Sequence, residues 1–159
     1  MLDAAHVRVF QAEHRNHLGQ PLRVDGAIGP QTEWAMDLET LTAARRAIVH
    51  AAIEHLGLTE NPRGSNSDPR GLIWGWLSRC GARPGDPWCA AYASHCIGTV
   101  KIAAAQALGR HFPATTQPCA GDVMWFPTCG VHGHCGIVTG VSAAEVMTVE
   151  GTNDNGVRC

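Results

Sequence analysis

The segment GDPWCAAYASHC, residues 85–96, contains a cysteine directly after Asp-Pro-Trp, at the expected start of a helix. Asp86 is a favourable N-cap residue and Pro87 suits the first helical position, which places Cys89 in the first turn. Unpaired backbone N–H groups and the helix dipole lower the pKa of a thiol there, because both stabilise the thiolate. The same N–H groups can hold the oxyanion that develops on a carbonyl substrate. Cys89 is therefore a candidate nucleophile.

A cysteine nucleophile requires a general base, and the chain contains nine histidines. His95 follows Cys89 by six residues, so its side chain is expected on another face of the same helix. His134 stands at the expected start of a strand, between Gly133 and Gly136, and these small residues leave space around its imidazole. His134 is therefore the candidate base.

The chain contains seven cysteines, an odd number that cannot pair completely within one chain. The N-terminus lacks the order of basic, apolar and small residues that is typical of a secretory signal. The sequence therefore predicts a protein made in the cytosol, with reduced thiols. Cys80 and Cys96 fall on the apolar faces of expected helices and are interpreted as core residues.

The composition argues against several classes of protein. The 159 residues suffice for one domain, alone or with a small appendage, and 45% of them are apolar, as in ordinary globular proteins. A net charge of −2 and the lack of basic runs argue against nucleic-acid binding. The apolar runs are too short to span a bilayer, so no membrane partner is expected.

The elements that must position these side chains are expected in a main domain that covers residues 42–159. Helical apolar periodicity extends over residues 43–57 and 72–80, and the helix that contains Cys89 comes next. The pattern then changes to three strands, at residues 121–126, 134–142 and 145–151. Helices followed by antiparallel strands predict an α+β fold.

Residues 1–41 are expected to form a separate small helical unit, with a first helix over residues 6–18. Pro30 begins a second helix, which places Trp34 and Leu38 on one face. The segments VRVFQ and VDGAIGPQTEWAM resemble the peptidoglycan-binding domain found beside many cell-wall hydrolases. The usual module has a further helix, so this copy is abbreviated. The alternative is a helical hairpin that only supports the main domain.

Four ordered motifs, PWCAAYASHC, GDVMWF, GHCGIVTGV and VEGTNDNG, resemble the CHAP family of cysteine, histidine-dependent amidohydrolases and peptidases. This resemblance implies a papain-like enzyme that cuts bacterial cell walls, with Cys89 as nucleophile, His134 as general base and Glu150 as the residue that orients the imidazole. Trp88 is expected to flank the substrate cleft. Family members usually continue with further strands, so the domain is expected to be truncated at Cys159.

Strand geometry leaves two candidates for the third member of the site. The last two expected strands form a hairpin with a turn near residues 143–144. With a two-residue loop, His134 lies opposite Asn153, and Glu150 faces the other side of the sheet. One additional loop residue moves Glu150 to the face of His134. The family resemblance favours Glu150, and Asn153 is the substitute candidate.

A zinc site is the main alternative to a thiol enzyme. Cys129, His132, His134 and Cys135 lie within seven residues, and both imidazole and thiolate are good zinc ligands. The cluster lacks the separated ligand pairs of structural zinc modules, and no HExxH motif is present. Another alternative is a wall-binding module without catalytic activity, against which the presence of both Cys89 and His134 argues.

The expected function is that of an endolysin-like peptidoglycan hydrolase that cleaves an amide or peptide bond. Its partner is bacterial peptidoglycan, it requires no cofactor or metal, and it is expected to be a monomer. Without a signal, it reaches the wall after release or delivery by another protein. The sequence does not distinguish an amidase from an endopeptidase.

Overall fold

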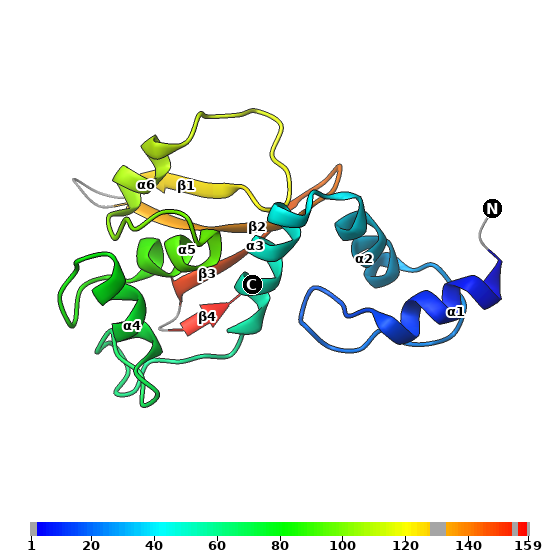
Figure 1. Ribbon diagram of the computed structural model, residues 1–159, viewed down its shortest axis with the longest axis horizontal. Coiled ribbons are helices and arrows are strands. Elements are labelled where there is room, and N and C mark those ends of the chain that lie inside the picture. Colours follow the sequence, from blue (N-terminus) through cyan, green and yellow to red (C-terminus); the bar gives the residue numbers. More distant parts are fainter. Residues whose placement is uncertain (1–2, 128–132, 154–155, 159) are drawn as a thin grey trace.

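The computed structural model describes residues 3–127, 133–153 and 156–158. Two helices of the N-terminal segment lie at one end of the molecule, and the remaining helices pack around an antiparallel sheet at the other end (Figure 1). This arrangement confirms the expected α+β fold. The expected division at residues 1–41 and 42–159 stays a prediction.

The described helices precede all the described strands along the chain. The helices are α1 (Ala4–Glu13), α2 (Pro30–Thr40), α3 (Ala43–Glu54), α4 (Leu72–Arg79), α5 (Cys89–Ile97) and α6 (Ala105–His111). No helix in the described part of the chain is both long and apolar enough to cross a membrane.

Helix α1 is shorter than the expected helix over residues 6–18. It ends at Glu13, and His14 adopts an extended conformation. The His14 ring stacks on Phe10 with 3.8 Å between ring centroids, and its Nδ1 lies 2.8 Å from the Phe10 carbonyl oxygen. The side chain thereby satisfies a carbonyl of the last helical turn, and the backbone is free to leave the helix. The second helix begins at Pro30, as expected, and buries Trp34 and Leu38.

The sheet has four strands in the order β1-β2-β3-β4, and all neighbours are antiparallel. The strands are β1 (Val123–Pro127), β2 (Gly133–Val141), β3 (Val146–Asn153) and β4 (Gly156–Arg158). Helix α5 packs against β2 and β3, α3 packs against α5 and β2, and α6 packs against β1 and β2. Helix α4 packs against α5.

Helix α5 lies at the centre of this packing, and its sequence explains why. Seven of its nine residues are buried, and small alanines allow close approach to the sheet and to α3. The Tyr92 hydroxyl donates to the Ala52 carbonyl oxygen at 2.6 Å, which ties α5 to α3. Gly98 ends the helix in a left-handed conformation, with φ of 78°. The burial of α5 fixes its N-terminus relative to the sheet.

The hairpin between β2 and β3 contains a bulge that decides which side chains share a face. At its tip Val141 pairs with Val146, and the Ser142 N–H donates to the Glu145 carbonyl oxygen, as a two-residue loop requires. The register then shifts by one residue between Val138 and Gly140. A shift of one residue changes, for every following pair, which side chains of β2 and β3 lie on the same face of the sheet.

Candidate active site

Helix α5 begins at Cys89, so the cysteine stands in the first turn as the sequence predicts. The expected N-cap is wrong, however, because Trp88 occupies that position and no side chain caps the helix. The Asp86 carboxylate instead accepts a hydrogen bond of 2.8 Å from the Arg83 backbone N–H, within the preceding turn. This carboxylate therefore does not compete with the thiol for the free N–H groups of the first helical turn.

Trp88 is fully buried, with 0% of its surface exposed, so the expectation that it flanks an open substrate cleft is wrong. Its indole N–H donates to Glu60 Oε1 at 2.8 Å, and the other oxygen of Glu60 accepts the Asn66 backbone N–H at 3.2 Å. The Asn66 side-chain amide donates to the Gly85 carbonyl oxygen at 2.8 Å. These contacts hold Trp88 and Gly85 in place, immediately before the start of α5, and thereby help to fix the position of Cys89.

The Cys89 thiol is 5% exposed and contacts two consecutive residues of β2. A hydrogen bond from the Cys135 thiol is the largest influence on Cys89, and hydrogen bonding and charge from His134 act in the same direction. Together they lower the pKa of Cys89 to about 5, although burial alone would raise it. Conversely, this contact and burial both raise the pKa of Cys135. Cys89 is the thiolate of the pair and Cys135 is the donor.

His134 connects the thiolate to a carboxylate. Its hydrogen bond with Cys89 and its second hydrogen bond, with Glu150, raise its pKa to about 9. The second bond joins His134 Nε2 to Glu150 Oε2 at 3.0 Å, which leaves Nδ1 for the thiol. The hydrogen bond from His134 lowers the pKa of Glu150, with further help from Thr148, against the opposing effect of burial. At neutral pH the three groups therefore form a row of alternating charge.

A close approach between strands makes room for this row. Glu150 pairs with Gly136, and a β-carbon on Gly136 would lie 2.6 Å from Glu150 Cγ. Only a glycine therefore lets the Glu150 side chain cross β2 toward His134. The bulge places Glu150 on the same face of the sheet as His134. The hairpin with one additional loop residue predicts the same arrangement, but the additional residue lies within β2 and not in the loop. The side chain of the substitute candidate, Asn153, lies outside the described part of the chain.

The structure thus brings Cys89, His134 and Glu150 together, while their catalytic roles stay predictions. Sequence reasoning missed the role of three neighbours of this row. It considered Cys135 only as a zinc ligand, and it did not consider Thr148 and Phe126. Thr148 Oγ1 donates to Glu150 Oε1 at 2.7 Å. Its position two residues before Glu150 on the same strand is a signal that could have revealed it. The half-exposed Phe126 ring lies against the His134 imidazole, with 5.5 Å between ring centroids.

Several other candidates lie away from this row. His95 pairs with His55, with 3.2 Å between their Nε2 atoms, beside Trp76. Cys96 is buried, and burial raises its pKa to about 12, as expected for a core thiol. Trp125 packs on Gly109 of α6 so closely that a β-carbon on Gly109 would lie 2.4 Å from Trp125 Cγ, and the partly buried Trp125 ring lies against the core.

Two residues of the alternative zinc cluster, Cys129 and His132, lie outside the described residues. The other two, His134 and Cys135, both contact Cys89. Within the described ranges, no group of three or more His, Cys, Asp or Glu side chains could hold a metal ion.

Replacing Cys135 with alanine is expected to raise the pKa of Cys89, because it removes the S–H donor that stabilises the thiolate. Alkylation by iodoacetamide across a pH series measures this pKa, and the rate near pH 6 should fall severalfold. Cys135→Ser retains a hydroxyl donor and should move the pKa less. An identical pH dependence in wild type and Cys135→Ala would contradict the assigned donor role.

The fold and this row together define an α+β domain built around a cysteine–histidine pair. Residues 81–153 match the family model of the CHAP domain, so this part of the chain is similar to that family. The match covers all three residues of the row, α5 and the first three strands. No curated protein and no solved structure matches the chain. CHAP domains are generally amidases or peptidases, with bacterial peptidoglycan as substrate.

Proposed function

We propose that this protein is a cysteine peptidoglycan hydrolase that cleaves an amide or peptide bond through Cys89 and His134. One observation carries the proposal: a thiol at a helix start interacts with a strand imidazole, and Nε2 of that imidazole is hydrogen-bonded to a carboxylate. An adjacent nucleophile, base and orienting group in this order is the arrangement that activates a thiol.

In the proposed reaction, the Cys89 thiolate attacks the carbonyl carbon of the scissile amide, and the carbonyl oxygen becomes an oxyanion. Free N–H groups at the start of α5 stabilise this charge. The His134 imidazolium then protonates the leaving amine, the C–N bond breaks, and a thioester to Cys89 remains. His134, now neutral, takes a proton from water, and the resulting hydroxide releases the acyl group as a carboxylic acid. The proton on His134 returns the pair to its starting state.

Glu150 acts through the imidazole. Its carboxylate accepts from Nε2, which directs Nδ1 toward Cys89 and stabilises the imidazolium. Thr148 in turn holds the carboxylate through its other oxygen. Both residues are partly buried in β3, so the ring has a fixed orientation before substrate arrives.

Digestion of purified peptidoglycan, followed by mass spectrometry of the products, tests this proposal. New amino termini within the peptide indicate an endopeptidase, and free lactyl groups on the glycan indicate an amidase. Release of neither product by wild-type protein would overturn the proposed function. The same assay addresses the alternative of a wall-binding module, which sediments with the wall and releases nothing.

The pH dependence of hydrolysis is expected to be bell-shaped. Below about pH 5 the Cys89 thiolate is protonated and loses its nucleophilicity, and above about pH 9 His134 loses the proton that the leaving amine needs. Activity should therefore be highest between these values and fall by about tenfold per pH unit on either side. Initial rates on a soluble peptidoglycan fragment measure the profile. Maximal activity at pH 4, or a rate that keeps rising above pH 10, would contradict a thiolate–imidazolium pair.

The remaining parts of the proposal concern how the protein reaches its substrate. The N-terminal segment binds the wall and keeps the hydrolase near it. The protein acts as a monomer on the cell wall, after release or delivery from the cytosol. Sedimentation of full-length Cys89→Ala protein with purified walls measures this binding without degradation of the wall.

A further inference from the structure

A cleft of about 530 Å³ separates α2 of the N-terminal segment from the hairpin of β2 and β3. It lies at the C-terminal end of β2, near Gly140, whereas His134 lies at the start of that strand. Six residues of extended strand span roughly 20 Å, so the cleft is a separate location from the cysteine–histidine pair. Its volume is in the range of sites that hold a small molecule or a peptide side chain.

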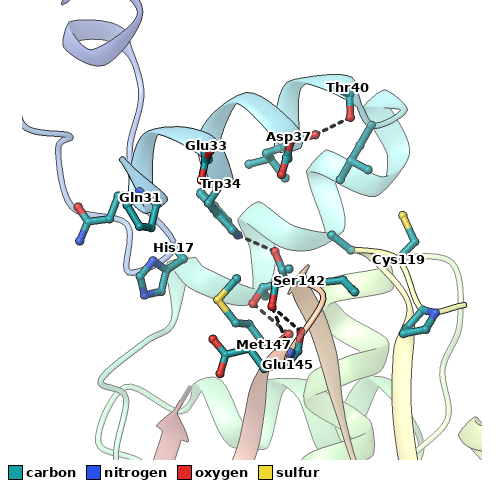
Figure 2. Close-up of a pocket in the computed structure, with 18 residues that line it drawn as sticks. His17, Gln31, Glu33, Trp34, Asp37, Thr40, Cys119, Ser142, Glu145 and Met147 are labelled. Carbon is teal, nitrogen blue, oxygen red and sulfur yellow. Dashed lines mark hydrogen bonds between the residues drawn. The ribbon is translucent and has the colours of Figure 1, made fainter. Parts of the chain in front are cut away.

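The floor of the cleft is apolar and has a fixed shape. Trp34 of α2 reaches across to the sheet, where its indole N–H donates to the Thr139 carbonyl oxygen at 2.8 Å (Figure 2). Met147 and Leu38 lie beside it in the lining. A β-carbon on Gly140 would lie 2.4 Å from Met147 Cε and 3.0 Å from the Trp34 ring, so the glycine allows this packing. The Trp34 hydrogen bond therefore joins the two walls and sets their separation.

The rim of the cleft carries negative charge from both walls. Glu33 and Asp37 stand one turn apart on α2, and Glu145 lies at the tip of the hairpin. All three residues are exposed, and none of the described ion pairs involves them. Among the described lining residues there is no lysine or arginine. The carboxylates thus line a space to which the described residues contribute no lysine or arginine and one imidazole, that of His17.

The geometry points to a binding site for a peptide that bears a long alkyl-ammonium side chain. Methylene groups of such a side chain fit the apolar floor, and its ammonium group meets the carboxylates at the rim. A shorter side chain does not reach from the apolar floor to the carboxylates at the rim, and an uncharged side chain contacts the floor without pairing with the carboxylates. An anionic ligand would be repelled by all three carboxylates. Charge and shape therefore select one chemical class of occupant.

If the proposed function holds, this occupant is the diamino acid of the peptidoglycan stem peptide. The cleft would then hold one stem peptide while a bond elsewhere in the wall lies at Cys89. Because α2 and the hairpin come from opposite ends of the chain, the site exists only when the N-terminal segment is docked on the sheet. The segment thereby gains a binding surface that its short helices do not provide alone.

Titration of full-length Cys89→Ala protein tests this inference by NMR, because this variant cannot consume the ligand. The probe is the soluble peptide L-Ala-γ-D-Glu-L-Lys-D-Ala, and its partner is the same peptide with norleucine in place of lysine. We expect a saturable shift of the Trp34 indole N–H with the lysine peptide. The norleucine peptide should bind about tenfold more weakly, and added salt should weaken only the lysine peptide.

A triple variant, Glu33→Gln, Asp37→Asn and Glu145→Gln, should lose affinity for the lysine peptide by about tenfold. The matched control is Glu13→Gln, which removes an exposed charge of α1 outside the cleft and should bind as the parent does. Equal binding of the two peptides, unchanged affinity in the triple variant, or absence of a Trp34 shift would overturn the inference. Wall hydrolysis by the wild-type protein distinguishes the cases: a failed titration with intact hydrolysis refutes only the cleft, and binding without hydrolysis refutes only the proposed function.

Discussion

Replacing Cys89 with alanine should reduce hydrolysis of peptidoglycan by about 10⁶-fold, the order of the loss that follows removal of the nucleophile in a serine protease. The reaction needs a thiolate at the start of α5, where the pKa of Cys89 is lowered to about 5. The pKa values of Cys80, Cys96 and Cys135 are raised instead. Release of soluble fragments from purified walls measures the loss. The variant should retain its fold, because the substitution removes one sulfur atom from the edge of the core.

Cys80→Ala is the matched control for loss of a thiol. Cys80 is half-buried at the end of α4, and burial raises its pKa, so it is a packing residue. This control should hydrolyse walls at the wild-type rate, and both variants should unfold cooperatively in a thermal scan. Hydrolysis that survives in Cys89→Ala would refute the thiol mechanism and direct attention to the alternative zinc cluster, which metal analysis of the purified protein would then address.

Replacing His134 with glutamine should reduce hydrolysis by about 10³-fold, within the range for loss of a general acid–base group. Two effects act together, because His134 is both the proton carrier and a group that lowers the pKa of Cys89. Iodoacetamide alkylation of Cys89 separates them. Its pH dependence should move to higher pH in His134→Gln, and raising the pH should restore alkylation while hydrolysis stays low.

His111→Gln is the control for loss of an imidazole. His111 is exposed at the end of α6, so its replacement should leave both hydrolysis and the alkylation profile unchanged. An unshifted alkylation profile in His134→Gln would mean that Cys135 alone sets the thiolate, and would contradict the assignment of His134 as its partner. Comparison with Cys135→Ala then shows how much His134 and Cys135 each lower the pKa of Cys89.

Local patterns in the sequence predicted most of what is local in the structure. The apolar periodicity around Trp76, the helix that starts at Cys89, and the three strands from residue 121 onward all occur close to their expected positions. These features depend on neighbours within one or two turns or along one strand, so the residues that specify them are adjacent in the chain. The cysteine at a helix start and the histidine at a strand start were therefore visible without coordinates.

Errors arose where the outcome depended on contacts between distant segments. Asp86 has the side chain of an N-cap, yet the turn before α5 uses that carboxylate for the Arg83 N–H. Trp88 stands beside the nucleophile in sequence, but the buried carboxylate of Glu60, 28 positions away, draws its indole into the core. Proximity along the chain does not determine which residue lines a cleft.

The sequence by itself determined helices α1 to α5, strands β1 to β3, their order and the two residue types that could react, whereas α6 and β4 were not predicted. Only the tertiary structure decided the third residue of the site. A bulge between Val138 and Gly140 changes which side chains of β2 and β3 share a face, and it brings Glu150 to His134. A bulge depends on packing of the whole sheet, and the alternation of side chains cannot reveal it. The docking of α5 likewise decided that Cys135 donates to Cys89. Such contacts join positions tens of residues apart, so no local pattern encodes them.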